Sequence, residues 1–151
     1  MRRKDREMPE EFARMVADKC EWAVISMIDT EGRPYGIPVT IARDEDALYF
    51  HCAMEGKKID ALQAHPQVSV ACVGDTCRLE DKFTTTYESA LIEGMAEEVT
   101  EDEEKIHALR LLCQRHTPKN MQNFEDAIKK SLKRTGIWKI KITSISGKCK
   151  K

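Results

Sequence analysis

Hydrophobic positions along the chain repeat with two different periods, and these periods predict which segments are helices and which are strands. Between Pro9 and Lys19, apolar residues recur at the spacing of a helix that buries one face, namely Phe12, Met15, Val16 and Cys20. Proline suits the first helical position, because its missing N–H would have no partner there. We therefore expect the first helix over residues 9–19.

Three segments with the character of β-strands follow this helix. Residues 22–28 are a short run rich in β-formers, which predicts a strand buried on both faces. In residues 35–42 apolar side chains alternate with small or polar ones, the period of a strand with one buried face. Because proline cannot donate to a β-ladder, Pro38 marks an edge strand or a bulge. Residues 47–52 form a third strand, and short polar turns predict that the three make an antiparallel meander.

The middle of the chain predicts one short helix and two further strands. Residues 57–64 have a helical pattern that ends at the His-Pro pair that follows. A strand over residues 68–73 leads into residues 74–82, which are polar, lack periodicity and predict a loop. A long strand over residues 84–99 is interrupted at Gly94, where we expect a bend or a bulge.

Two helical segments and a last strand complete the pattern. Thr100 and Glu103 have the spacing of a capping box at the start of a helix that reaches about residue 114. A second helical piece covers residues 124–133, and Gly136 begins a strand with apolar residues on one face. The total is six strands and three or four helices. This predicts a mainly β fold, a small antiparallel β-barrel with flanking helices.

Composition and charge limit the classes of protein to which the chain can belong. A length of 151 residues, 41% of them hydrophobic and 34% charged, suits one globular domain over residues 1–151. A net charge of -1 without a basic stripe argues against nucleic acid as a partner. No segment approaches the roughly 20 apolar residues of a membrane-spanning helix. We expect no membrane partner.

The cysteines and the N-terminus indicate a cellular compartment. The six cysteines are scattered without a C-x-x-C pair, so we expect reduced thiols and no metal site. The basic N-terminus is not followed by an apolar run, as it would be in a secretory signal. We therefore expect a cytoplasmic protein.

The candidate functional segment connects the third predicted strand to the short helix. The strand ends at His51-Cys52, a loop containing Gly56 follows, and the helix opens with Lys57 and Lys58. Helix N-termini attract phosphate, and lysines in a first turn are unfavourable without an anion. The segment can be a phosphate cradle or a solvated basic turn, and these residues by themselves leave both open.

These residues also carry a resemblance to a known family. Residues 49–70 resemble the phosphate-binding region of the pyridoxamine 5'-phosphate oxidase-like FMN-binding split barrels, and the resemblance spans about residues 11–148. Within that superfamily the chain is most similar to the Nim-type nitroimidazole-resistance proteins. The segments that carry the resemblance are Gly-Arg-Pro-Tyr-Gly-Ile-Pro-Val at 32–39, His-Cys-Ala at 51–53, Glu-Gly-Lys-Lys at 55–58 and Ser-Gly-Lys at 146–148.

The resemblance implies a six-stranded antiparallel FMN-binding split barrel and a homodimer with FMN at the subunit interface. Lys57 and Lys58 match the basic pair that holds the phosphate. Pro38, Val39 and Thr40 match the strand whose backbone lies along the isoalloxazine ring, and His51 matches the residue at the end of the next strand. Trp138 is open to a second interpretation as a core residue. The full set of residues implied to bind the cofactor is Pro38, Val39, Thr40, Phe50, His51, Lys57, Lys58, Ser89 and Trp138.

The function implied is that of an FMN-dependent oxidoreductase. We expect an NAD(P)H-linked reductase of small electron-poor acceptors such as nitroimidazoles, with His51 as the catalytic residue that supplies a proton. No dinucleotide fingerprint is present, so the nicotinamide would bind transiently. The chain lacks the C-terminal Arg-x-His motif of true pyridoxamine phosphate oxidases, so oxidation of pyridoxine phosphate is not expected.

Other interpretations stay open, and one is that His51 is only packed under the flavin ring and takes no part in the chemistry. The protein can instead be a non-catalytic flavin- or haem-binding module used for storage or sensing, with His51 as an axial ligand. It can also be a plain interaction domain in which Lys57 and Lys58 are only surface charge. His107 and His116 lie on or just after a predicted helix, and we expect both at the surface.

Overall fold

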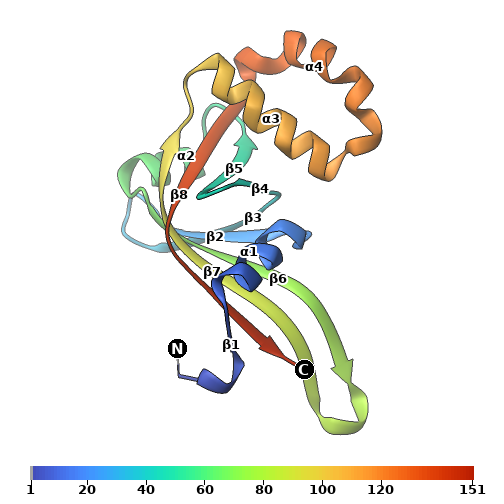
Figure 1. Cartoon of the computed structure of the whole chain (residues 1–151). Helices are drawn as coiled ribbons and strands as arrows, with labels where there is room; N and C mark the ends of the chain where they lie inside the picture. The colour runs from blue at the N-terminus through green and yellow to red at the C-terminus, as the bar shows by residue number, and fades with distance from the viewer. Residues whose placement is uncertain (1) are drawn as a thin grey trace.

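Eight strands form one antiparallel sheet in the computed structural model, which describes residues 2–151 (Figure 1). Six of them match the predicted strands, and the additional two are short, β1 (Glu7–Met8) and β4 (Ala42–Asp44). The six are β2 (Ala23–Ile28), β3 (Pro34–Val39), β5 (Ala47–Cys52), β6 (Gln67–Leu79), β7 (Thr84–Glu98) and β8 (Gly136–Lys150).

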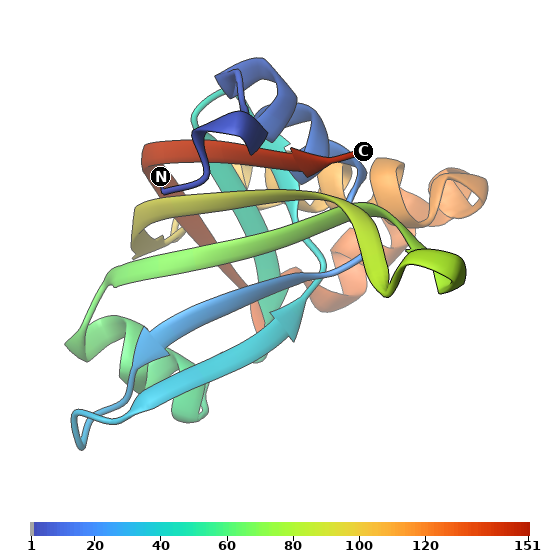
Figure 2. The same cartoon turned by 90° about the horizontal axis from the view of Figure 1, so that it is seen from below.

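The sheet curls without closing. Its strand order is β3-β2-β6-β7-β8-β5-β4, and β1 pairs with β8 (Figure 2). The predicted mainly β split barrel is therefore confirmed, although with eight strands and not six. β3 is an edge strand, as Pro38 predicted.

The predicted meander of three consecutive strands is wrong. β2 and β3 do form a hairpin, but β5 pairs with β8 and β4 and not with β3. Turn composition shows where the chain reverses, whereas the partner of a strand depends on contacts with distant segments. The two edge strands are β3 and β4, and the open side between them is the split in the barrel.

Within residues 2–151, four α-helices flank the sheet: α1 (Glu10–Lys19), α2 (Lys57–Ala64), α3 (Asp102–His116) and α4 (Phe124–Ser131). α1 packs against β8, β7 and β6 and buries Val16 as predicted, whereas Met15 is exposed. The capping box at Thr100 is wrong, because Glu101 is the N-cap of α3 and no side chain caps that helix. No helix within residues 2–151 is long and apolar enough to cross a membrane.

β2 is buried on one face only, which corrects the expectation of a strand buried on both. Ala23, Ile25 and Met27 face the core, whereas Val24 is 42% exposed and Ile28 is also exposed. A short apolar run does not reveal whether its second face has a partner. This second face lies on the outside of the sheet.

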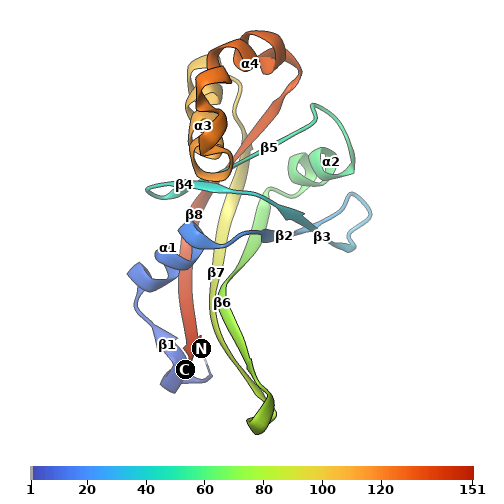
Figure 3. The ribbon, with the colours of Figure 1, turned by 90° about the vertical axis from the view of Figure 1, so that its right-hand side faces the viewer.

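The segment predicted as a polar loop over residues 74–82 is largely strand. β6 continues to Leu79, a 3₁₀ turn covers Glu80–Lys82, and β7 returns from Thr84. The hairpin extends well beyond the body of the sheet in Figures 1 and 3. The backbone hydrogen bonds to β7 make this segment a strand in spite of its polar composition. Phe83, at the tip of the hairpin, is fully exposed.

The bend or bulge predicted at Gly94 is confirmed as an irregularity in the strand pairing. The pairing of β7 with β8 shifts register between Glu93 and Gly94. A Cβ at position 94 would lie 2.5 Å from the carbonyl oxygen of Lys141, so only glycine fits without a shift of the backbone. The bend helps to curl the sheet around its core.

The core lies inside the curl of the sheet. Ile25, Phe50, Val70, Ile92 and Ile140 are fully buried there. A smaller cluster under α3 contains Tyr49, Val99, Ala108 and Ile137. The two clusters share β5, whose successive side chains face opposite sides, so this strand connects the barrel core to α3.

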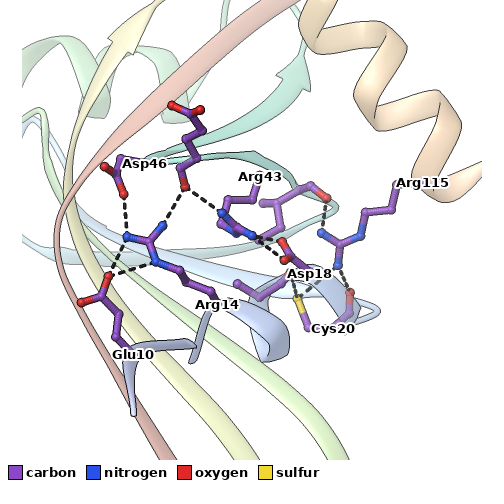
Figure 4. Close-up of polar contacts among 10 residues, drawn as sticks. Glu10, Arg14, Asp18, Cys20, Arg43, Asp46 and Arg115 are labelled. Carbon is purple, nitrogen blue, oxygen red and sulfur yellow. Dashed lines mark hydrogen bonds and ion pairs between the residues drawn. The ribbon is translucent and has the colours of Figure 1, made fainter. Parts of the chain in front are cut away.

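Arginines tie the helices to the connection between β3 and β5 (Figure 4). Arg14 of α1 pairs with Glu10 at 2.7 Å and with Asp46 at 2.6 Å. Arg115 of α3 donates to the carbonyl oxygens of Ile41 at 2.8 Å and Cys20 at 2.7 Å. Arg43 pairs with Asp18 at 2.6 Å. These contacts hold the chain around Thr40 and Ile41 in place.

Candidate functional site

The N-terminus of α2 presents two lysines and an uncapped first turn. Gly56 is the N-cap, with a φ of +135° that favours glycine, and no side chain caps the helix. Lys57 and Lys58 are the first two helical residues. Backbone N–H groups of a first helical turn have no partner within the helix and carry partial positive charge. The turn is therefore suited to an anion.

The two lysines differ in their surroundings. The ammonium of Lys57 lies 3.2 Å from the carboxylate of Asp29 and 4.5 Å from the centre of the Tyr35 ring. Lys58 is half-buried and forms none of the ion pairs found among residues 2–151. Lys57 is thus oriented by the β2–β3 hairpin, whereas the Lys58 charge is available to a ligand. In Figure 3, α2 lies beside the connection between β2 and β3.

His51 lies at the end of β5, where it pairs with Ile137 of β8. Desolvation by the surrounding protein lowers its pKa, and the positive charges of Lys58 and His116 lower it further. The imidazole is consequently neutral at neutral pH. Its imidazolium form is a stronger acid than an ordinary histidine, which suits a proton donor.

A cavity of about 190 Å³ joins His51 to Thr40 and to the C-terminal half of α3. Its remaining lining residues are Leu109, Leu112, Cys113, His116 and Thr117. His116, expected at the surface, is half-buried, and its Nε2 bonds to the carbonyl oxygen of Ile41 at 2.8 Å. Because a carbonyl oxygen can only accept, Nε2 of His116 carries a proton. No sequence signal relates α3 to His51.

His107 is exposed, as predicted, and its Nε2 lies 2.8 Å from the Asp44 carboxylate.

The strand implied to lie along the flavin ring is at the edge of the sheet. Pro38 is exposed, Val39 is buried, and Thr40 is half-buried just beyond the end of β3. Among residues 2–151, β3 pairs only with β2, so backbone groups on its other side have no strand partner in the ladder there. An edge of this kind can hydrogen-bond to a planar polar ligand.

Three predicted site residues do not join this group within the chain. Phe50 and Trp138 pair across β5 and β8, and both side chains are buried in the core. Ser89 pairs with Lys148 near the far end of β8, whereas His51 pairs near its beginning. Contact of these three residues with a cofactor stays a prediction.

The outer face of the sheet carries a row of exposed apolar residues. Pro38 pairs with Val24, Val24 with Ala71, and Ala71 with Leu91, so the four side chains share one face. Val24 is 42% and Leu91 48% exposed, and Trp22 and Val73 are also exposed. A row of this kind marks an interaction site more often than a free surface.

Comparison with known proteins gives one family match and several structural ones. The family model for pyridoxamine 5'-phosphate oxidase matches residues 11–149. No curated protein matches the chain. A proposed 5-nitroimidazole antibiotic resistance protein from Bacteroides thetaiotaomicron VPI-5482 is similar in structure, with a TM-score of 0.79 and 23% identity, over 95% of this chain and 86% of that one.

Two further structures share the fold. The flavocytochrome Anf3 from Azotobacter vinelandii has a TM-score of 0.79 and 20% identity, over 95% of this chain and 68% of that one. The FAD and heme binding protein from Mycobacterium smegmatis has a TM-score of 0.81 and 20% identity, over 97% and 74% of the two chains. Because the family model covers nearly the whole chain, the protein belongs to the pyridoxamine 5'-phosphate oxidase family.

Proposed function

We propose that the protein is an FMN-dependent oxidoreductase that reduces small electron-poor acceptors such as nitroimidazoles. One observation carries the proposal: the uncapped N-terminus of α2, with Lys57 and Lys58, follows the strand that ends at His51, beside the open split of the barrel. Membership of the family supports a flavin as the ligand.

The residues at the start of α2 fit a phosphate group. Backbone N–H groups of the first turn and the ammonium groups of Lys57 and Lys58 are the donors that a phosphate monoester requires. Nothing lies within 4 Å of where a Cβ of Gly56 would be, so a ligand can approach the backbone there. These residues would hold the phosphate end of FMN.

The residues of the split also fit the flavin ring. The free edge of β3, from Pro38 to Thr40, offers backbone groups to the polar rim of the ring. When bound, FMN would supply the electron transfer between a nicotinamide and the acceptor. The protein would orient the ring and exclude water, and an imidazole nitrogen of His51 would hold the proton that the acceptor requires.

The apolar row on the outer face supports a homodimer. Pro38 lies in the same row as Val24 and Leu91, so a second copy on this face would lie next to the strand proposed to contact the ring. FMN would then be enclosed at the subunit interface, and NAD(P)H would bind transiently from solution. The electron acceptor would be a small molecule.

A second candidate function is non-catalytic binding of flavin or haem. His51 is exposed, and its neutral ring, with one nitrogen lone pair available to a metal, lines the same cavity as His116. Two structural relatives are named as a flavocytochrome and as an FAD and heme binding protein. In this alternative His51 would bind the haem iron and no turnover would occur.

The visible spectrum of the purified protein and titrations with FMN, FAD and haem test these proposals. We expect a flavin spectrum, saturable uptake of FMN, bleaching by NAD(P)H without oxygen, and recovery on addition of a nitroimidazole. A colourless protein that takes up no FMN would overturn the main proposal. Bound flavin that NAD(P)H does not reduce, together with a Soret band after haem addition, would favour the second candidate.

A further inference from the structure

Asp29 is one of two buried charged residues found within residues 2–151, the other being Lys105. It directly follows β2 and begins the turn to β3. Its Oδ1 accepts hydrogen bonds from the backbone N–H groups of Glu31 at 3.0 Å and Arg33 at 2.9 Å. Burial of a carboxylate costs free energy unless the charge is paired. The partners of its second oxygen, Oδ2, therefore show how the charge of Asp29 is balanced.

The second oxygen of Asp29 faces the proposed phosphate subsite. Oδ2 lies 3.2 Å from Nζ of Lys57 and 3.4 Å from Nε of Arg33. The Arg33 backbone N–H and the Lys57 ammonium lower the pKa of Asp29 although burial opposes them, so the group is ionised at neutral pH. A fixed anion thus lies behind a lysine whose side chain is 56% exposed.

A second contact from the same hairpin restricts Lys57. Its ammonium lies over the ring of Tyr35, 4.5 Å from the centre. A free lysine side chain populates many rotamers, and their loss on binding a ligand opposes binding. The contacts with Asp29 and Tyr35 restrict those rotamers before any ligand arrives.

We propose that Asp29 is a positioning residue of the phosphate subsite, which acts through Lys57 and orients its ammonium for the phosphate of FMN. The inference rests on the proposed function, because it requires that the subsite binds a flavin phosphate. Lys58 has no such support, so the two lysines contribute by different routes. Asp29 raises the affinity for the phosphorylated flavin and has no effect on binding of the flavin ring.

An opposing electrostatic effect makes the sign of the coupling between Asp29 and Lys57 the quantity to test. A carboxylate near a phosphate also repels it and competes for the same ammonium. If orientation dominates, Lys57 contributes less to FMN affinity once Asp29 is neutralised. If competition dominates, Lys57 contributes more.

The test is a double-mutant cycle on Asp29→Asn and Lys57→Met, with affinities for FMN and riboflavin measured by fluorescence titration. Asparagine keeps the oxygen that accepts the turn hydrogen bonds and removes the charge. We expect Lys57→Met to weaken FMN binding about 10-fold in the wild-type background, and distinctly less in the Asp29→Asn background. Riboflavin affinity, which involves no phosphate, should be unchanged in all variants.

Matched variants separate positioning from general damage. The cycle of Asp29→Asn with Lys58→Met should be additive, because these residues do not pair. Asp75→Asn removes the remote ion pair with Lys19 and should leave FMN affinity unchanged. Should Asp29→Asn fail to fold, Tyr35→Leu removes the other contact to Lys57 and should reduce the contribution of Lys57 in the same way.

The outcomes are distinguishable. A Lys57→Met effect that is equal or larger in the Asp29→Asn background, while FMN still binds, overturns this inference and leaves the proposed function intact. Wild-type protein that binds neither FMN nor riboflavin overturns both. A riboflavin affinity that falls in parallel with that of FMN also overturns the inference, because the effect would then not act on the phosphate.

Discussion

The hydroxyl of Tyr49 in β5 donates a 2.9 Å hydrogen bond to the carboxylate of Glu104 in the first turn of α3. Lys139 of β8 approaches the same carboxylate oxygen at 2.6 Å. The three residues tie α3 to two neighbouring strands. Since α3 covers the cavity beside His51, this contact connects the stability of the fold to the candidate site.

Removal of the Glu104 charge should destabilise the protein. We expect Glu104→Gln to lower the free energy of unfolding by about 1–3 kcal/mol, since Tyr49 and Lys139 lose their charged partner. Urea denaturation measures this change. Glu103→Gln, on the exposed face of the same turn, is the control and should have almost no effect. Equal stability of the two variants would contradict the assignment.

The same contact predicts a loss of stability in alkali. Burial, followed by Glu104, raises the pKa of Tyr49 from 10.0 to about 12, and hydrogen bonding to Glu104 raises the pKa of Lys139 from 10.5 to about 12. A group whose pKa is higher in the folded than in the unfolded protein contributes its full stabilisation at pH values below the unfolded-state pKa. This stabilisation disappears as the pH rises through the folded-state pKa. Stability should therefore fall between about pH 10 and 12, and Tyr49→Phe should make that fall shallower in pH-dependent urea melts.

Lys58 should contribute to flavin binding through charge. We expect Lys58→Ala to weaken FMN binding by about 10- to 100-fold, because a charge-assisted hydrogen bond to phosphate is lost. Added salt should reduce this difference, and riboflavin should bind equally well to both proteins. Lys82→Ala, on the turn at the tip of the β6–β7 hairpin, is the control. Unchanged FMN affinity in Lys58→Ala would argue for a solvated basic turn.

His51 should produce a pH dependence in the reduction of an acceptor. Because its pKa is lowered, we expect the rate to fall as pH rises through a value below 6.5, where the imidazolium loses its proton. In the His51→Gln variant the rate should no longer fall over this pH range, and it should be lower by about 100-fold or more. His107→Gln, which changes an exposed histidine, should keep the wild-type profile. Stopped-flow oxidation of the reduced flavin at several pH values measures both.

The apolar outer face should be required for dimer formation. We expect Leu91→Lys to shift the protein towards monomer in sedimentation velocity and to weaken FMN binding in parallel, since the proposed site is completed by the second copy. Met15→Lys is the matched control, because it changes an exposed apolar residue on α1, away from this face. A dimer that survives Leu91→Lys would place the interface elsewhere.

Gly94 should not tolerate a side chain. A Cβ there would lie 2.5 Å from the Lys141 carbonyl oxygen and 2.6 Å from Cγ2 of Ile140. We expect Gly94→Ala to destabilise the protein by about 1–3 kcal/mol through overpacking, measured by thermal or urea unfolding. Gly36→Ala is the control, since the nearest atom would be 3.7 Å away. A similar loss in both variants would mean that the close approach is not the cause.

Local periodicity was enough to locate most elements. The alternation in residues 35–42, the strand predicted over residues 47–52 and the helical spacing in residues 9–19 located β3, β5 and α1 within a few residues. Gly94 and Pro38 predicted the bend and the edge strand, because each acts through its own backbone geometry. In these cases the physical cause lies within a few neighbouring residues.

Properties that depend on a distant partner could not be predicted in this way. Residues 74–82 have the composition of a loop and become mostly strand because β7 supplies a ladder. Val24 belongs to a run that appeared fully buried, but its side chain is exposed on the outer face of the sheet. The pairing of β5 with β8 likewise depends on contacts that cross most of the sequence.

For the candidate site, the sequence by itself determined that a strand ending at His51 is followed by a helix opening with Lys57 and Lys58, because that order is local. Only the tertiary structure brought Asp29 to Lys57 and His116 to the cavity beside His51. Those neighbours come from the β2–β3 turn and from α3. Their distances from Lys57 and His51 are set by the folding of the chain and not by proximity in the sequence. The positively charged helix start was thus predictable, whereas the anion that orients one of its lysines was not.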